Sequence, residues 1–207
     1  MNIVCLDLEG VLLPEIWIAF AEATGINEFR RTTRDEPDYD KLMHSRIDTL
    51  KKHKLKLYDI QKIIEHVSPL CGALEFSNAV REKTQLIILS DTYEEFAKPL
   101  MSKLNYPTLF CNSLVVAEDG SIIDYKLRQK DGKKHAVAAL KSLNIRVFAA
   151  GDSFNDLAMI READAGCLFC APSSIREQEA KNDVPCIDTY GELLEKISVF
   201  LRTESSS

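Results

Sequence analysis

Oxygen-rich side chains follow three short apolar segments that lie far apart in the chain. Asp7-Leu8-Glu9-Gly10 follows the first segment, Ser90-Asp91-Thr92 the second, and Gly151-Asp152-Ser153-Phe154-Asn155-Asp156 the third. Each apolar segment is typical of a buried parallel strand, and the carboxyl ends of parallel strands meet at the edge where open α/β sheets bind ligands. Any one of these polar groups alone would be an ordinary turn or cap. Together they predict one site at that edge of a sheet.

The residue types at this edge suit phosphoryl transfer. Asp7 and Asp152 offer hard oxygen ligands of the kind that Mg²⁺ prefers. An unperturbed aspartate has a pKa of about 3.9, so Asp7 is expected to be ionised at neutral pH and able to attack phosphorus. Glu9 lies two residues further on, where its carboxyl would face the same side and could protonate the leaving oxygen. Ser90 and Lys133 could bind the phosphoryl oxygens, whose charge must be stabilised during transfer.

The elements between these groups alternate between strands and helices, which predicts a parallel sheet with helices on both faces. The pattern predicts helices over 73–83 and 133–143 and strands over 3–8, 86–89, 147–150, 166–170 and 184–187. Residues 108–116 and 121–127 flank Asp119-Gly120 and predict a β-hairpin. Thr92-x-x-Glu95 and Ser153-x-x-Asp156 are expected to cap the helices that follow them. We therefore expect a Rossmann-like, doubly wound α/β core with a small β-hairpin.

An all-helical stretch interrupts this alternation directly after the first strand. Helices are predicted after Pro14, over 39–53 and over 58–67, and no convincing strand occurs between them. This stretch is best explained as an insertion. The predicted organisation is a core of residues 1–13 and 71–207 with a helical cap of residues 14–70.

Composition narrows the possible partners. The 207 residues include 26 Lys and Arg and 32 Asp and Glu, which gives a net charge of −6 and argues against broad binding to nucleic acid or to anionic membranes. No apolar run approaches the ~20 residues of a membrane span, and the N-terminus lacks the basic region of a signal peptide. The six cysteines are therefore expected to be reduced, and the protein is predicted to be cytoplasmic.

The polar motifs resemble those of the haloacid dehalogenase-type phosphohydrolases along the whole chain. Asp7-Leu8-Glu9-Gly10-Val11 resembles the first family motif, Ser90 the second, Lys133 the third and Gly151-Asp152-x-x-Asn155-Asp156 the fourth. The resemblance implies that Asp7 is the nucleophile and forms a phosphoaspartate. It also implies Mg²⁺ bound by Asp7, by the backbone carbonyl of Glu9 and by Asp152, with the Asp7 strand at the centre of the sheet.

Within this family the chain is most similar to the phosphoserine phosphatase group. The run Gly166-Cys167-Leu168-Phe169-Cys170-Ala171-Pro172 looks like a segment of that group. Further runs resemble the bifunctional phosphoserine phosphatase/phosphoserine:homoserine phosphotransferases of the ThrH type: 7–12, 14–20, 127–131 and 149–153. The wider family usually has Asp two residues after the nucleophile, whereas the ThrH type shares the glutamate found here as Glu9. The resemblance thus implies hydrolysis of phosphoserine and transfer of its phosphoryl group to homoserine.

The same resemblance suggests how phosphoserine would be recognised. Glu15 matches the family's amine-binding glutamate, and Arg46 matches its carboxylate-binding arginine, a side chain whose fork suits a carboxylate. Asn155 is expected near the phosphate. Lys133 is preferred to its neighbours Lys130 and Lys134 for the third motif because it falls in the first turn of the helix that leads to the last motif. Asp156 is expected to support its loop or cap a helix rather than to bind the metal.

Three alternatives stay open at this point. The first is a phosphatase of another small phosphate monoester on the same scaffold. The second is a receiver domain of two-component signalling, which also combines an acidic Mg²⁺ site with Ser or Thr and Lys but has no helical insertion. The third is a catalytically silent binding protein, which the apparent completeness of the motifs disfavours. The sequence does not indicate an oligomeric state.

Overall fold

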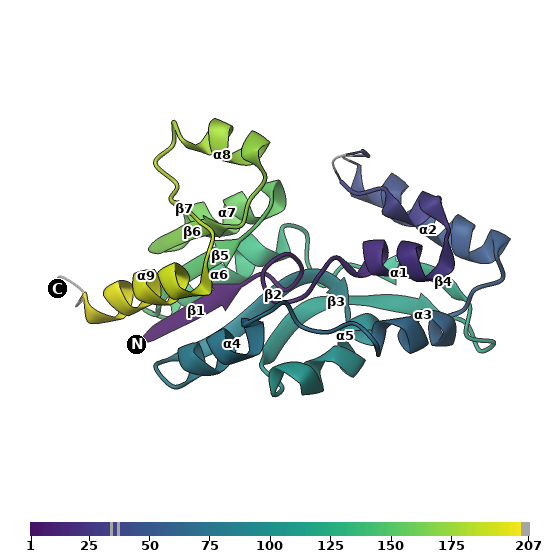
Figure 1. Cartoon of the computed structure of the whole chain (residues 1–207), viewed down its shortest axis with the longest axis horizontal. Helices are drawn as coiled ribbons and strands as arrows, with labels where there is room; N and C mark the ends of the chain where they lie inside the picture. Colours follow the sequence, from purple (N-terminus) through teal and green to yellow (C-terminus); the bar gives the residue numbers. More distant parts are fainter. Residues whose placement is uncertain (34, 37, 204–207) are drawn as a thin grey trace.

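A seven-stranded sheet forms the centre of the protein, whose computed structural model describes residues 1–33, 35–36 and 38–203 (Figure 1). The strands stand in the order β4-β3-β2-β1-β5-β6-β7. Their bounds are β1 Asn2–Leu6, β2 Gln85–Tyr93, β3 Thr108–Val116, β4 Ile122–Lys126, β5 Arg146–Gly151, β6 Ala165–Phe169 and β7 Cys186–Ile187. Every pairing is parallel except that of β3 with β4, which form the predicted hairpin. The strand that leads to Asp7 is central, as expected.

Helices cover both faces of this sheet, as a doubly wound fold requires. The alternation within β1 shows why: Val4 and Leu6 pack on one face, while Ile3 and Cys5 pack on the other. The first face is covered by α4 (Ala73–Arg81), α5 (Glu94–Met101, followed by η2, Ser102–Leu104) and α9 (Tyr190–Arg202). The second is covered by α6 (Gly132–Ser142), α7 (Leu157–Glu162) and α8 (Ser173–Glu179). The predicted α/β fold class is confirmed.

Helices are the main elements of the described chain between β1 and α4. It forms α1 (Ile16–Thr24), η1 (Asn27–Arg30), α2 (Tyr39–Lys52) and α3 (Leu57–Ile64). Its aromatic side chains join the core: Trp17 stacks on Phe29 and meets the ring of Phe96 edge-on. The inserted helices and the sheet core thus share one hydrophobic cluster. The division into a core and a cap at residues 13/14 and 70/71 stays a prediction. No described helix combines the length and the apolar character needed to cross a bilayer.

The β-hairpin fixes where α2 lies. The Tyr125 hydroxyl of β4 donates to the Asp40 carboxylate at 2.8 Å, and the Tyr125 ring meets Tyr39 edge-on. At the hairpin tip, Lys56 Nζ lies 3.1 Å from Asp119 Oδ2. The Tyr125 contacts hold α2 against β4, and the Lys56 contact holds the start of α3 against the hairpin tip.

The predicted capping box at Thr92 and Glu95 is wrong. β2 runs on to Tyr93, Thr92 is buried within it, and α5 begins only at Glu94. The Glu95 carboxylate instead accepts a hydrogen bond from the backbone N–H of Leu114 at 2.9 Å. A β-branched residue and an aromatic residue that can both be buried favour extended backbone here over a helix start.

Candidate active site

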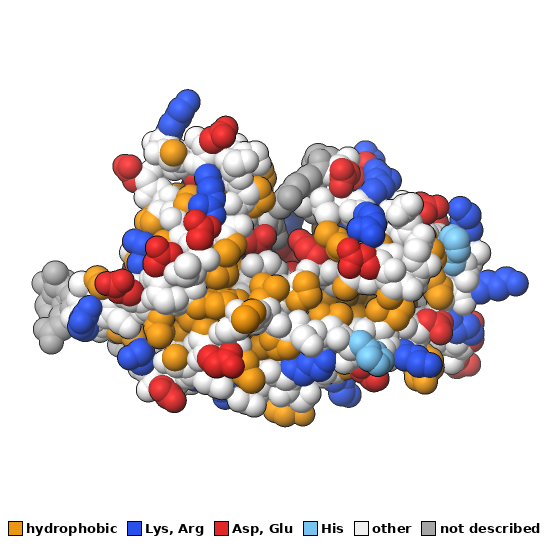
Figure 2. All heavy atoms as spheres, in the orientation of Figure 1, with side chains coloured by type: hydrophobic (Ala, Val, Ile, Leu, Met, Phe, Trp, Pro, Cys, Tyr) orange, Lys and Arg blue, Asp and Glu red, His pale blue; other side chains and the backbone are white. Residues whose placement is uncertain are grey.

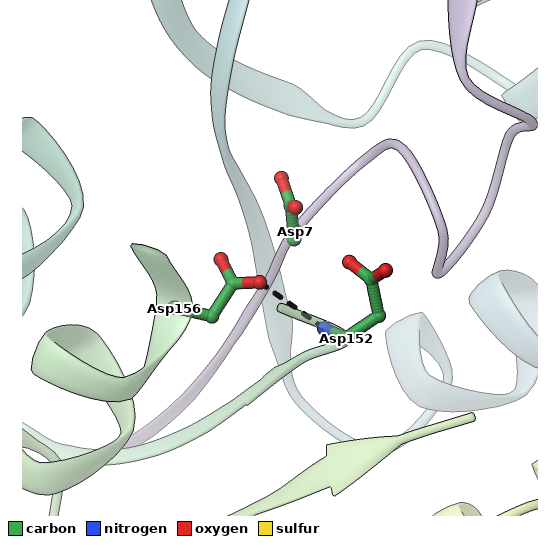
Figure 3. A group of neighbouring side chains, drawn as sticks. All are labelled: Asp7, Asp152 and Asp156. Atoms are coloured by element: carbon green, nitrogen blue, oxygen red, sulfur yellow. Dashed lines mark hydrogen bonds between the residues drawn. The ribbon is translucent and has the colours of Figure 1, made fainter. Parts of the chain in front are cut away.

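Three aspartates from the carboxyl ends of β1 and β5 face one another (Figure 3). Asp7 directly follows β1, and its backbone N–H donates to the carbonyl of Ala150 in β5 at 3.0 Å. Asp7, Asp152 and Asp156 each place one carboxylate oxygen within 4.8 Å of the others. Two loops separated by more than a hundred residues therefore meet in one acidic cluster. The surface is hollowed between the parts that carry α8 and α2, and acidic side chains lie in this hollow (Figure 2).

Asp156 holds the loop after β5 in shape. Its Oδ2 accepts hydrogen bonds from the backbone N–H groups of Asp152 and Ser153 at 3.1 and 3.0 Å and from the Ser153 hydroxyl at 3.0 Å. This arrangement is the capping box predicted for Ser153 and Asp156, and it opens the short helix η3 (Phe154–Asp156). Gly151 leaves the space for it, because a Cβ there would lie 2.3 Å from the Asp156 carboxyl carbon.

Lys133 is the cation at the centre of the cluster. Its side chain is 6% exposed, and its Nζ lies 2.9 Å from Asp7 Oδ1 and 2.8 Å from Asp156 Oδ1. Burial alone would lower the pKa of Lys133, but the carboxylates of Asp156 and Asp7 raise it well above its usual range. Lys130 and Lys134, the two alternatives for the third motif, are exposed.

Glu9 and Arg46 lie toward the inserted helices, Arg46 on α2 and Glu9 just before α1. The Glu9 carboxylate accepts the backbone N–H of Ile16 at 3.0 Å, while Glu15 is exposed at the start of α1. Burial and then the charge of Glu15 raise the pKa of Glu9 to about 8, so Glu9 can carry a proton at neutral pH. Arg46 is 7% exposed, and its positive charge acts on Glu9.

The Arg46 guanidinium is held by packing but keeps an unused donor. It lies 4.7 Å from the centroid of the Trp17 ring and donates to the carbonyl of Arg31 at 2.8 Å. Its Nε is buried and has no hydrogen-bond partner among the described residues. A buried donor without a partner lowers the stability of the fold, and this is typical of a group that binds a ligand.

Ser90 and Asn155 lie near Lys133, and Asn155 contacts Asp91, a residue that the sequence did not single out. The buried Ser90 hydroxyl accepts the backbone N–H of Thr92 at 3.2 Å, which leaves its own proton free. The Asn155 amide donates to Asp91 Oδ2 at 2.8 Å, and Lys133 Nζ is 3.5 Å from the same oxygen. Asp91 thus contacts two of the predicted phosphate-binding groups.

Comparison with known proteins identifies the family. A model of the haloacid dehalogenase-like hydrolases matches residues 1–164. The chain belongs to this family. It is 51% identical to phosphoserine phosphatase ThrH of Pseudomonas aeruginosa over 207 residues, which are 100% of this chain and 98% of that protein. It is 53% identical to a phosphoserine phosphatase of Pseudomonas syringae pv. tomato over 193 residues, 93% of this chain and 81% of that protein.

Solved structures agree with the fold. A substrate-bound phosphoserine phosphatase complex matches with a TM-score of 0.77 and 21% identity, covering 94% of this chain and 97% of that one. A phospho-aspartyl intermediate analogue of phosphoserine phosphatase matches with a TM-score of 0.76 and 20% identity, covering 94% and 98%. The family and the phosphoserine phosphatase group predicted from the sequence are confirmed, and the chain is an enzyme of a hydrolase family.

The acidic cluster of this haloacid dehalogenase-like hydrolase has the donor set of a divalent-cation site. Burial and then the charge of Asp156 raise the pKa of Asp152 to about 7, and the same two causes raise the pKa of Asp7. One ammonium group therefore does not neutralise the carboxylates around it, and a cation on their oxygens would. Gly10 also fits this arrangement: it has a φ of +77°, and a Cβ there would lie 2.4 Å from the Asp152 carboxyl carbon.

Tyr39 and Tyr93 are further residues of the site that sequence reasoning missed. Their hydroxyls lie 2.7 Å apart, and Tyr39 also donates to the carbonyl of Asp91 at 3.3 Å. Tyr39 begins α2 and Tyr93 ends β2, so the pair joins the inserted helices to the sheet. Asp91 could have been found from its position beside Ser90. The tyrosine pair carries no signal in the sequence, because it depends on how α2 docks.

The raised pKa of Asp152 predicts how stability depends on pH without metal. The folded-state pKa of about 7 exceeds the ordinary value of 3.8, so the folded protein binds more protons than the unfolded chain between these values. The free energy of unfolding of metal-free protein should therefore fall as pH rises through about 4 to 7. Thermal melting in chelator should show this decline, and Asp152→Asn should weaken it.

Asp183→Asn removes an exposed carboxylate after α8 and serves as the matched control. It should leave the slope of the parent protein unchanged. A decline equally steep in Asp152→Asn and in the parent would contradict the assignment. Added Mg²⁺ should raise the melting temperature more at about pH 8 than at about pH 5, because the cation binds the ionised carboxylates.

Proposed function

We propose that this protein is a Mg²⁺-dependent phosphoserine phosphatase that works through a phosphoaspartate on Asp7. The observation that carries the proposal is the convergence of Asp7 and Asp152 within 4.8 Å, with Lys133 Nζ 2.9 Å from Asp7. The full-length similarity to phosphoserine phosphatase ThrH supports the choice of substrate. Phosphatase action on another small phosphate monoester is the alternative.

In the first proposed step, an Asp7 oxygen attacks phosphorus and the bond to the serine oxygen breaks. The new bond makes an acyl phosphate, and the leaving oxygen takes a proton from Glu9, whose pKa of about 8 keeps that proton available. The ammonium of Lys133, the free hydroxyl proton of Ser90 and the amide of Asn155 would bind the three phosphoryl oxygens. Serine leaves with its hydroxyl restored.

In the second step, an acceptor oxygen attacks phosphorus and Asp7 leaves as a carboxylate. Glu9, now ionised, accepts the proton of the attacking water, and inorganic phosphate is the product. If an alcohol takes the place of water, the same proton transfer gives a new phosphate ester. The cycle then ends with Asp7 ionised and Glu9 protonated, as it began.

Mg²⁺ fits beside Asp7, where the oxygens of Asp7 and Asp152 and the backbone carbonyl of Glu9 would hold it. When bound, it would offset the negative charge of the phosphate and keep Asp7 ionised. The Asp156 carboxylate is already engaged by its loop and by Lys133, so we assign it a supporting role.

The remaining groups account for an amino acid substrate. We assign the carboxylate of phosphoserine to Arg46, whose Nε is buried and unpaired within the described structure. We assign the ammonium group to Glu15, which is exposed beside Glu9. A zwitterion held at both ends would place its side-chain oxygen toward Asp7.

Homoserine is the proposed second acceptor. It carries the same ammonium and carboxylate groups as serine, so Arg46 and Glu15 could bind it once serine has left. Transfer therefore needs no catalytic group beyond those of hydrolysis. With this assignment we propose a cytoplasmic enzyme of serine and threonine biosynthesis. Residues 14–70 would act as a cap on the core of residues 1–13 and 71–207.

Replacing the nucleophile tests the first step. Asp7→Asn keeps the size of the side chain but removes its nucleophilic carboxylate, so phosphoserine turnover with Mg²⁺ should fall by about three orders of magnitude or more. Steady-state release of inorganic phosphate measures this. The Asp183→Asn variant is the matched control and should turn over at the parent rate. Turnover of Asp7→Asn near the parent rate would refute the nucleophile.

Substrate recognition can be separated from chemistry at Arg46. Arg46→Ala removes the donor assigned to the substrate carboxylate, so KM for phosphoserine should rise about 10- to 100-fold. An aryl phosphate has no amino acid carboxylate, and its kcat/KM should change far less. Because Arg46 also packs on Trp17, the aryl phosphate reports whether the variant is folded. Equal losses for both substrates would remove the recognition role.

Product analysis tests the transferase activity. Phosphoserine turnover with Mg²⁺ in the presence of homoserine should give phosphohomoserine at the expense of inorganic phosphate. The fraction transferred should rise with homoserine concentration, because water and homoserine compete for one intermediate. Homoserine methyl ester lacks the free carboxylate and should be a poorer acceptor. Release of inorganic phosphate alone at saturating homoserine would limit the protein to hydrolysis.

A further inference from the structure

We propose that Asp91 is an internal anion that competes with phosphate for the phosphate-binding groups and opposes the retention of inorganic phosphate. This inference rests on the proposed function, because it takes Lys133 and Asn155 as phosphate ligands. The inference is based on one carboxylate oxygen, Asp91 Oδ2, which lies 2.8 Å from Asn155 Nδ2 and 3.5 Å from Lys133 Nζ. Neither the catalytic steps nor the metal site uses this residue.

The donors of Lys133 are few, and two of them are already used. An ammonium group has three N–H bonds. Asp156 and Asp7 lie 2.8 and 2.9 Å from the nitrogen, and Asp91 is the third and most distant partner at 3.5 Å. A phosphoryl oxygen that binds Lys133 must therefore replace Asp91, since giving up Asp7 or Asp156 would release the nucleophile or the loop.

The same exchange applies to Asn155. Its Nδ2 donates to Asp91 Oδ2, and its Oδ1 lies beside the Ser153 hydroxyl. A phosphate that binds both donors would take the place of the Asp91 carboxylate on Asn155 Nδ2 and Lys133 Nζ.

The backbone of Asp91 is fixed, whereas its side chain lies partly in solvent. Its carbonyl accepts the Asn112 amide of β3 at 3.1 Å and the Tyr39 hydroxyl of α2 at 3.3 Å. Its side chain is 46% exposed, so a displaced carboxylate would enter water and stay near the site. Lys133 and Asn155 lower the pKa of Asp91 against the effect of burial, so the carboxylate is charged.

The negative charge of Asp91 affects the binding of substrate and the binding of product differently. Phosphoserine is also held through its amino acid groups, which can offset repulsion between its phosphate and Asp91. Inorganic phosphate has no such second attachment. Repulsion by Asp91, and its return to Lys133 and Asn155, therefore weaken the binding of the product more than that of the substrate.

The test is the binding of inorganic phosphate to the Mg²⁺-loaded full chain, measured by calorimetry. Asp91→Asn keeps the size of the side chain and removes its charge, so the Kd of phosphate should fall about tenfold. Asp91→Glu keeps the charge and should stay within about threefold of the parent. Asp183→Asn removes one charge from an exposed turn and should bind phosphate like the parent. Thermal melting checks that each variant is folded.

The outcomes separate the inference from the proposed function. Tighter phosphate binding in Asp91→Asn alone supports the inference, even if phosphoserine proves not to be the substrate. Unchanged or weaker binding in folded Asp91→Asn overturns it, even if phosphoserine is turned over. With phosphoserine as substrate, Asp91→Asn should also increase product inhibition by phosphate more than it lowers KM. A positioning role without competition would instead reduce kcat and leave product inhibition unchanged.

Discussion

A buried ammonium group holds the acidic end of the sheet together. Lys133 lies within 3 Å of both Asp7 and Asp156, which come from loops after different strands. Buried carboxylates without a positive partner would be strongly destabilising, so this lysine is what allows the loops to approach each other. One positive charge still leaves the cluster negative. Burial, and then the charge of Asp156, raise the pKa of Asp7 and of Asp152, and a divalent cation on their oxygens would offset the remaining negative charge.

The inserted helices are coupled to this cluster by packing as well as by polar contacts. Trp17 stacks on Phe29 and meets Phe96 of α5, and it also lies under the Arg46 guanidinium. The aromatic cluster that stabilises the helical insertion therefore also orients the side chain assigned to the substrate carboxylate. On the other side, Tyr39 reaches the carbonyl of Asp91. A shift of α2 would thus affect both Arg46 and the backbone of Asp91.

Much of the fold could be predicted from the sequence because the patterns that indicate it are local. Buried strands, the Asp119-Gly120 hairpin and the Ser153/Asp156 capping box each follow from neighbouring residues, and each is present. The expectation for Thr92 and Glu95 failed because tertiary burial of Thr92 and Tyr93 extended β2 beyond the point where a cap pattern suggested a helix. The convergence of Asp7, Lys133 and Asp152 could be predicted from topology. The partners of Asp91 and the pairing of Tyr39 with Tyr93 depend on how distant elements dock, which no local pattern encodes.

The balance between water and an alcohol as acceptor should depend on the side of the site that carries Glu9. The proposed base is fixed by the backbone of Ile16 and lies near Arg46, so any acceptor it activates must sit beside the groups assigned to the amino acid. In the proposed mechanism an alcohol held there has a high effective concentration, whereas water must enter the space that serine leaves. The ratio of inorganic phosphate to the new phosphate ester then depends on how long an alcohol occupies that space. It does not depend on a change in the catalytic groups. For this reason, substitutions on α1 and α2 should alter the choice of acceptor more readily than substitutions at the sheet, which serves both acceptors equally.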